Sequence, residues 1–150
     1  MRTAAQSAIE NARECGARMG VSAQALRKAL PSVRMEAAER TRTLELCQQL
    51  SQVASEVASG VAGLDAVNAQ SSDEIREVLH TLSTLEAQAM QVLSGFAFLV
   101  DSLEQAAERD EANEPAYALV IDAAAGLLQS FEKAKSATEA LRTALGGRRQ

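Results

Sequence analysis

Residues 73–111, DEIREVLHTLSTLEAQAMQVLSGFAFLVDSLEQAAERDE, decide the fold of this chain. The stretch contains no proline, and its apolar residues recur at alternating steps of four and three. The members of this stripe are Ile75, Leu79, Leu82, Ala89, Leu93, Phe96, Val100, Leu103 and Ala107, interrupted at Glu86, where the neighbouring Leu85 can substitute. Such a repeat places one apolar stripe on a helix and favours knobs-into-holes packing at about 20°. The stretch therefore predicts one long helix packed lengthwise against others.

Two further segments carry the same seven-residue rhythm. One predicted helix runs from the Ser32 cap to about Val67, and the other runs from Pro115 to about Leu145. Their stripes are Leu46, Leu50, Val53, Val57, Leu64 and Val67 in the first, and Val120, Ala124, Leu127, Phe131, Ala134, Leu141 and Leu145 in the second. Short connections at 68–72 and 112–114 force neighbouring helices to run antiparallel. At 1.5 Å per residue, the helices would form a rod of roughly 50–60 Å.

The N-terminal segment predicts two shorter helices. The first would run from about Thr3 to Met19 and stop at Gly20; Ser22 would cap the second, which ends before Pro31. The sequence as a whole therefore predicts an all-α fold: an elongated antiparallel helical bundle of three long heptad-patterned helices plus two shorter N-terminal helices. We expect an N-terminal helical pair at 1–31, the long bundle at 32–147 and a short basic tail at 148–150, in one compact unit.

The composition argues against an enzyme. Among 150 residues, 47% are hydrophobic, but there is no tryptophan and a single tyrosine, so material for a ligand pocket with aromatic walls is scarce. We expect no cofactor and no small-molecule substrate. The apolar runs at 96–100 and 116–121 fall far below the ~20 residues that cross a bilayer, which predicts no membrane association. Two distant cysteines indicate a reducing, cytoplasmic location, and the alanine-, arginine- and glutamine-rich composition is typical of bacterial proteins.

Candidate catalytic and metal-binding groups do not form a site in the sequence. Glu77 and His80 have the E-x-x-H spacing of helical di-iron proteins, but those proteins need two such pairs and His80 is the only histidine. Glu86, Asp101 and Asp122 lie in or beside apolar stretches, where a polar residue more often fixes register or partner choice than performs acid–base chemistry. We therefore expect no catalytic residue and no metal site.

One local pattern points towards nucleic acid. In ARECGARMGVSAQALRKALP, residues 12–31, Gly16 is small, Gly20 can form a turn and Ser22 can cap the following helix. The pattern resembles the helix-turn-helix of bacterial DNA-binding proteins, over about twenty residues. The resemblance implies that the second helix enters the major groove of DNA and presents Ser22, Gln24, Arg27 and Lys28. The same residues could instead form a packed corner between two helices.

The charge distribution separates the two ends of the chain. Residues 1–43 carry eight basic and four acidic side chains, a net charge of +4, so the remainder carries −9 of the chain's total of −5. A basic segment on an acidic chain favours an anionic partner for that segment, whereas the acidic remainder would repel nucleic acid.

Two stretches carry more apolar surface than one stripe requires. GFAFLV at 95–100 and ALVIDAAAGLL at 118–128 are apolar almost all round their helices. Such helices must be covered on several sides, either by the N-terminal helices or by a second copy of the chain, and the sequence favours a homodimer. The expected interface residues are Phe96, Phe98, Leu99, Val120 and Ile121. The sequence thus predicts a non-enzymatic interaction module, such as an adaptor, chaperone-like or regulatory protein; the alternative is a dimeric DNA-binding regulator.

Overall fold

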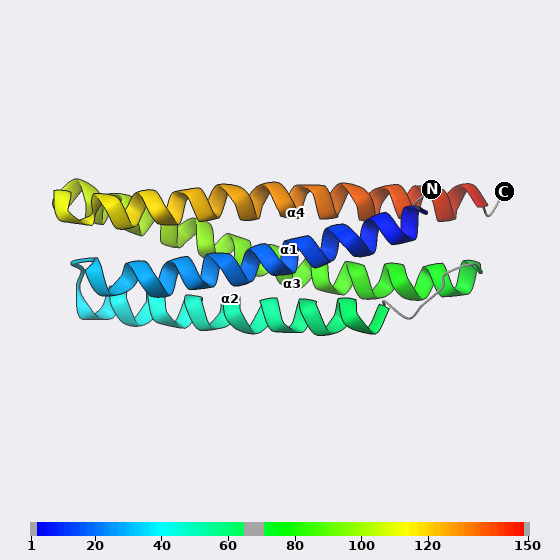
Figure 1. Ribbon diagram of the computed structural model, residues 1–150, viewed down its shortest axis with the longest axis horizontal. Helices are drawn as coiled ribbons and strands as arrows, with labels where there is room; N and C mark the ends of the chain where they lie inside the picture. The colour runs from blue at the N-terminus through cyan, green and yellow to red at the C-terminus, as the bar shows by residue number, and fades with distance from the viewer. Residues whose placement is uncertain (1–2, 65–70, 149–150) are drawn as a thin grey trace.

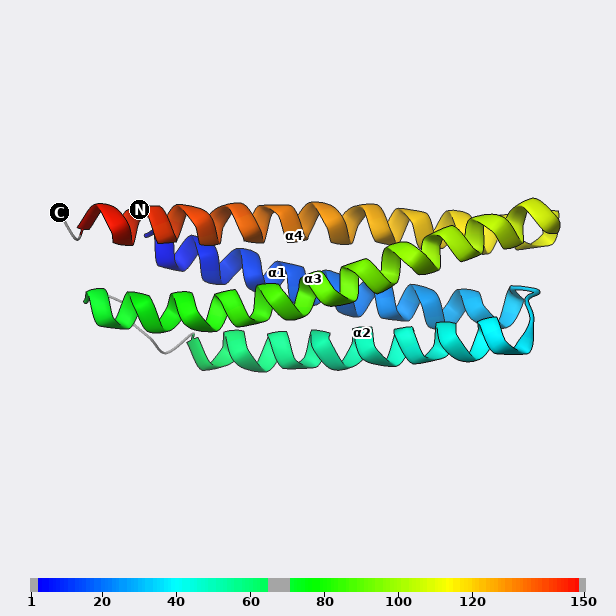
Figure 2. The ribbon, with the colours of Figure 1, turned by 180° about the vertical axis from the view of Figure 1, so that it is seen from behind.

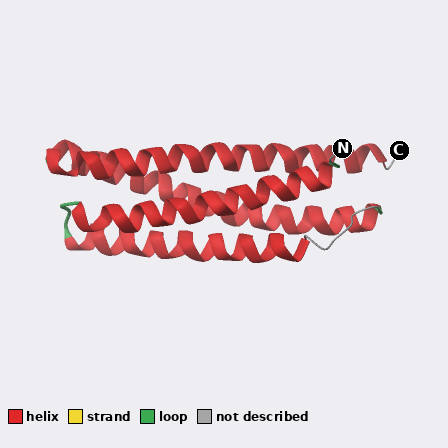
Figure 3. Cartoon of the chain, viewed as in Figure 1, coloured by secondary structure: helices red, strands yellow, loops and turns green. Residues whose placement is uncertain are grey.

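The described part of the chain is almost entirely helical. A computed structural model describes residues 3–64 and 71–148 (Figures 1 and 3). Within these residues there are four α-helices and no strand: α1 Ala4–Ala29, α2 Ala37–Leu64, α3 Ser72–Arg109 and α4 Glu114–Arg148. Short 3₁₀ turns follow α1 at Leu30–Ser32 and precede α4 at Glu111–Asn113. The all-α prediction is confirmed.

The four helices form an elongated antiparallel bundle. Each helix runs opposite to the helices next to it in the chain, and α1 packs against α2 and α4, as α3 does on the opposite side of the core (Figures 1 and 2). The α1–α4 interface is the most extensive, and α2 and α3 contact each other least among neighbouring helices. At 1.5 Å per residue the 38 residues of α3 extend about 57 Å.

The predicted break at Gly20 is wrong: α1 is one helix of 26 residues. No glycine in the described residues adopts a positive φ, so Gly20 makes no turn. Ser22, predicted to cap a second helix, is instead 1% exposed, and its hydroxyl donates to the carbonyl oxygen of Ala123 in α4 at 3.3 Å. Packing of α1 along α2 and α4 therefore outweighs the cost of a mid-helix glycine. The bundle has four long helices, not three long and two short.

Other predicted boundaries can be compared directly with the structure. The Thr3 hydroxyl caps α1, with the Gln6 side chain bonded back to the Thr3 N–H, and the Ser71 hydroxyl caps α3 through the N–H of Glu74. The long helix expected from Ser32 begins later, at Ala37, and its expected end at Val67 lies outside the described residues. Of the predicted tail, Arg148 belongs to α4 and 149–150 lie outside the described residues.

Small residues let α1 approach its neighbours. Its buried face consists largely of alanine, with Met19 and Leu26 as the largest fully buried side chains. At Gly16 an added Cβ would lie 2.9 Å from Cγ1 of Val57 in α2, closer than side-chain carbons normally approach. At Gly20 an added Cβ would meet nothing within 4 Å. The two glycines of α1 therefore have different roles: Gly16 permits close packing, and Gly20 does not.

Replacing each glycine with alanine separates these roles. Gly20→Ala should raise the free energy of unfolding by about 0.5–1 kcal/mol, because alanine is the better helix former and finds open space. Gly16→Ala gains the same propensity but forces a methyl against Val57, whose branched side chain has little freedom, at a cost of about 1–3 kcal/mol. Urea unfolding followed by far-UV circular dichroism measures both. A destabilising Gly20→Ala would place Gly20 in a turn.

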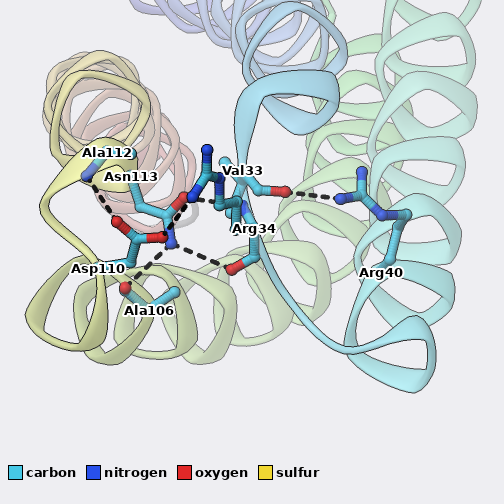
Figure 4. A network of polar contacts seen from close by, with 7 residues as sticks. All are labelled: Val33, Arg34, Arg40, Ala106, Asp110, Ala112 and Asn113. Atoms are coloured by element: carbon cyan, nitrogen blue, oxygen red, sulfur yellow. Dashed lines mark hydrogen bonds and ion pairs between the residues drawn. The ribbon is translucent and has the colours of Figure 1, made fainter.

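A buried asparagine ties the two hairpins together at one end of the bundle (Figure 4). The Asn113 side chain is buried between the α1–α2 and α3–α4 connections; its Oδ1 accepts from the N–H of Arg34 at 2.7 Å, and its Nδ2 donates to the carbonyl oxygens of Arg34 and Ala106 at 3.1 and 3.0 Å. On the α2 side, the Arg40 guanidinium donates to the carbonyl oxygens of Leu30 and Val33 at 2.9 and 2.6 Å. The α3–α4 hairpin is thereby anchored to the remainder of the bundle.

Candidate functional site

An open apolar groove lies between α3 and α4. Its volume is about 370 Å³, and its lining is almost wholly aliphatic or aromatic. The residues that line it are Leu93, Phe96, Ala97, Val100, Asp101, Ile121, Ala124, Ala125 and Leu128. Phe96 is buried, whereas Ile121 is 37% exposed and Leu128 is 50% exposed. Of the larger apolar side chains exposed in the described residues, these two share one groove, which makes it the leading candidate site.

The groove arises because α4 carries two adjacent apolar stripes. Val120 and Leu127 are fully buried in the core, seven residues apart. Ile121 and Leu128 follow each of them by one residue, so they form a second stripe rotated by about 100° around the helix. On α3, Leu93, Ala97 and Val100 have i, i+4, i+7 spacing and line the opposite wall. The bundle core uses the first stripe of α4 and leaves the second at the surface.

The predicted interface residues fall into two groups. Phe96, Leu99 and Val120 are buried because they pack in the core of the four-helix bundle, although Phe96 also contributes to the lining of the groove. Ile121 lines the groove. Leu128 was not among the predicted residues. Its position seven residues after Ile121 places it on the same face of α4 and could have indicated it.

Phe98 is exposed but belongs to a different surface. Its ring is 51% exposed and lies beneath the Arg42 guanidinium, whose carbon is 4.3 Å from the ring centroid. The surrounding depression of about 180 Å³ is formed by α2, α3 and Met35, and it includes Glu39, which pairs with Arg109 at 3.6 Å. The chain's own cation therefore already occupies one face of this ring.

The α2–α3 side of the bundle is polar. A groove of about 360 Å³ is lined by Gln49, Gln52, Val53, Glu56, Gln88, Gln91 and Val92. The Oε1 atom of Gln88 is buried there without a hydrogen-bond partner. Side-chain amides hydrogen-bond well to water, so this groove suits a solvated surface better than an apolar stripe of a partner.

Carboxylates gather at one end of the α3–α4 groove. Tyr117 precedes Ile121 by four residues on α4 and is partly buried. Desolvation and then the charges of Glu104, Asp101 and Glu108 raise the pKa of its phenol. Asp101 lines the groove, and Glu104 and Glu108 follow it by three and seven residues on α3, so all three carboxylates lie on one face of this helix.

Both cysteines are buried in the interior of the bundle. Burial, followed by the charge of Glu14, raises the pKa of the Cys15 thiol to about 11, so it is not an activated nucleophile. Cys15 borders an internal cavity of about 30 Å³, room for about one water molecule. Cys47 is also buried, and its thiol donates to the carbonyl oxygen of Ala23 at 3.4 Å. In residues 3–64 and 71–148, no three His, Cys, Asp or Glu side chains are grouped to hold a metal ion.

The residues of the predicted helix-turn-helix do not form that motif. Ser22 faces α4 in the interior, while Gln24, Arg27 and Lys28 are exposed on an uninterrupted α1. Arg27 donates towards the Ser51 hydroxyl of α2 at 3.4 Å. Because α1 packs along both α2 and α4, residues 12–31 contain no second helix that projects for insertion into a major groove. Residues 12–31 therefore do not provide the separate recognition helix that the DNA-binding hypothesis requires.

Comparisons with known proteins assign this chain to no family. No protein-family model matches this chain, and no curated protein or solved structure matches it. Among the described helices, none is long and apolar enough to span a lipid bilayer.

Proposed function

We propose that this chain is a non-enzymatic interaction module that binds an α-helix of another protein in the groove between α3 and α4. The observation that supports it is the second apolar stripe of α4, with Ile121 and Leu128 exposed beside an apolar groove of about 370 Å³. An exposed apolar patch with a polar rim is typical of interaction sites, and an amphipathic helix in a hydrophobic groove is a recurring mode of recognition.

The dimensions of the groove suit a helical partner. Ile121 and Leu128 are seven residues apart, so they span about 10 Å, or two helical turns. A partner helix that presents apolar residues at i, i+3 or i+4, and i+7 repeats over the same length. Each large apolar side chain that becomes fully buried contributes about 1.5–3 kcal/mol. With two or three anchors, and after the cost of association, we expect a dissociation constant on the order of micromolar.

The groove is formed by rigid elements. Both walls are regular helix, and the hairpin that joins α3 and α4 is anchored by Asn113 to the chain around Arg34. A binding surface that is already ordered loses little conformational entropy when a partner binds. The α3–α4 groove therefore combines exposed apolar area with preorganisation, whereas the α2–α3 side is polar or already covered by Arg42.

Charge insertion at the groove tests the proposal. An Ile121→Glu/Leu128→Glu double variant should fold and lose binding to the partner by at least about 100-fold, because it adds two carboxylates to an apolar contact. Leu44→Glu is the matched control: Leu44 is 47% exposed on α2, which does not line the groove. The measurement is quantitative retention of proteins from cell extract on each immobilised chain, with folding checked by circular dichroism. Equal retention by all three chains would contradict the proposal.

A further inference from the structure

Four carboxylate side chains continue the two walls of the groove towards Tyr117. Asp101 lines the groove, and Glu104 and Glu108 follow it on α3 at steps of three and four, which keeps them on one face. Glu114 precedes Ile121 by seven residues and so continues the exposed stripe of α4. Within the part of the chain that the structure describes, none of these four carboxylates forms an ion pair.

The opposite end of the groove does not balance this charge. Glu86 precedes Leu93 by seven residues on α3, and Glu132 follows Leu128 by four on α4. Lys135, seven residues after Leu128, is the cation that continues the α4 stripe. The flanks of the groove thus carry an excess of carboxylates at both ends, which is larger at the Tyr117 end.

This distribution disfavours a second copy as the occupant. In a symmetric dimer the same patch meets itself, so the acidic flanks of one groove would face the acidic flanks of the other. Like charges brought together across an interface oppose association and reject the wrong partner. A basic partner, in contrast, would meet complementary charge on both sides of the apolar contact.

We propose that the groove receives a cationic amphipathic helix from another protein, with its apolar residues against Ile121 and Leu128 and a cluster of Lys or Arg residues over Tyr117, Glu104 and Glu108. This inference rests on the proposed function, because it names the chemistry of the partner that the groove binds. The partner's cations face carboxylates that form no ion pair within residues 3–64 and 71–148, and the partly exposed ring of Tyr117 offers an additional surface for a cation.

Two synthetic peptides probe this chemistry. Both are fluorescein-labelled, about 18 residues long and carry leucine at i, i+4 and i+7; four lysines at one end of the first are glutamines in the second. Fluorescence anisotropy with the full chain should show the lysine peptide binding at least about tenfold more tightly at low salt, with the difference shrinking at high salt as charges are screened. Glu104→Lys/Glu108→Lys should weaken binding of the lysine peptide about tenfold or more and leave the glutamine peptide unchanged.

A second charge reversal supplies the matched control. Glu45→Lys/Glu56→Lys changes the net charge equally, at exposed positions of α2 outside the α3–α4 groove. It should alter binding of the lysine peptide by less than about twofold. An equal effect of the two charge reversals would overturn the inference, since the peptide would then be responding only to the net charge of −5.

The remaining outcomes separate this inference from the proposed function. Equal binding of the two peptides, abolished for both by Leu128→Glu, would overturn the charge inference and support the groove. A stable dimer by light scattering that Leu128→Glu dissociates would make a second copy the occupant and overturn the cationic partner. Absence of binding by either peptide would count against both the groove and its charge.

Discussion

Replacing Leu127 with alanine should lower the free energy of unfolding by about 3–4 kcal/mol, whereas Leu128→Ala should cost less than about 1 kcal/mol. Leu127 is fully buried in the core, and Leu128, its neighbour in sequence, is 50% exposed at the groove. Truncation of a buried leucine loses its burial and leaves a cavity, because a close-packed core relaxes only partly. The identical change at Leu128 removes a side chain that water already reaches.

Urea unfolding at equilibrium, monitored by circular dichroism, measures both variants in the same chain. The pair controls for helix propensity, since both substitutions replace leucine with alanine one residue apart on α4. Equal losses of stability at the two positions would mean that both stripes of α4 are buried. In that case the groove would not be an open surface.

Replacing Asn113 with alanine should cost about 2–3 kcal/mol of stability, a large effect for a polar residue in a connection. The change leaves the Arg34 N–H without an acceptor and the Arg34 carbonyl oxygen without a donor, in a part-buried setting. The Ala106 carbonyl oxygen keeps a second donor, the N–H of Asp110 at 3.1 Å. The main loss of stability therefore comes from the backbone N–H and carbonyl oxygen of Arg34, which lose the hydrogen bonds to the Asn113 side chain.

Arg34→Ala is the control for Asn113→Ala. The Arg34 side chain is 77% exposed, and its ion pair with Asp110 at 3.5 Å should contribute about 0.5 kcal/mol or less. The variant keeps the backbone groups that Asn113 binds. Thermal and urea unfolding should therefore rank Asn113→Ala well below Arg34→Ala in stability; equal losses would indicate that the surface ion pair, not the buried amide, joins the two hairpins.

The long helices were predictable because three kinds of local signal agree on them. The apolar pattern of residues 73–111 is found in α3, and Ser71, in the predicted short connection at 68–72, caps that helix. Pro115 stands at the second position of α4, where the absence of an N–H costs nothing. Where pattern, cap and breaker coincide, the helix follows from local sequence alone.

The error at Gly20 has a tertiary cause. Glycine followed by a cap residue is good chemistry for a turn, and the same residues are also compatible with a continuous helix. The choice depends on burial of Ser22 against Ala123, about one hundred residues away in the sequence. The hydrogen bonds between Asn113 and Arg34 also join residues far apart, 79 positions in the sequence, so no local pattern could have predicted them.

The candidate site was half predictable for a related reason. The surplus of apolar residues at 118–128 was evident, and it correctly marked α4 as having more than one apolar face. Which face enters the core depends on where α1 packs. If residues 3–30 formed two short helices, nothing in the sequence would distinguish Val120 from Ile121 as the residue that enters the core. In the four-helix bundle Val120 is buried and Ile121 borders the groove.

The most direct test of the central claim, that the α3–α4 groove contacts another protein, is site-specific photo-crosslinking in the cells that make this chain. A benzophenone amino acid at position 128 should give an adduct with a different protein, and the peptide joined to it should have an amphipathic helical pattern. The same group at position 44 should give no such adduct. Adducts at 44 but not at 128, or adducts at 128 only with a second copy of this chain, would contradict the account.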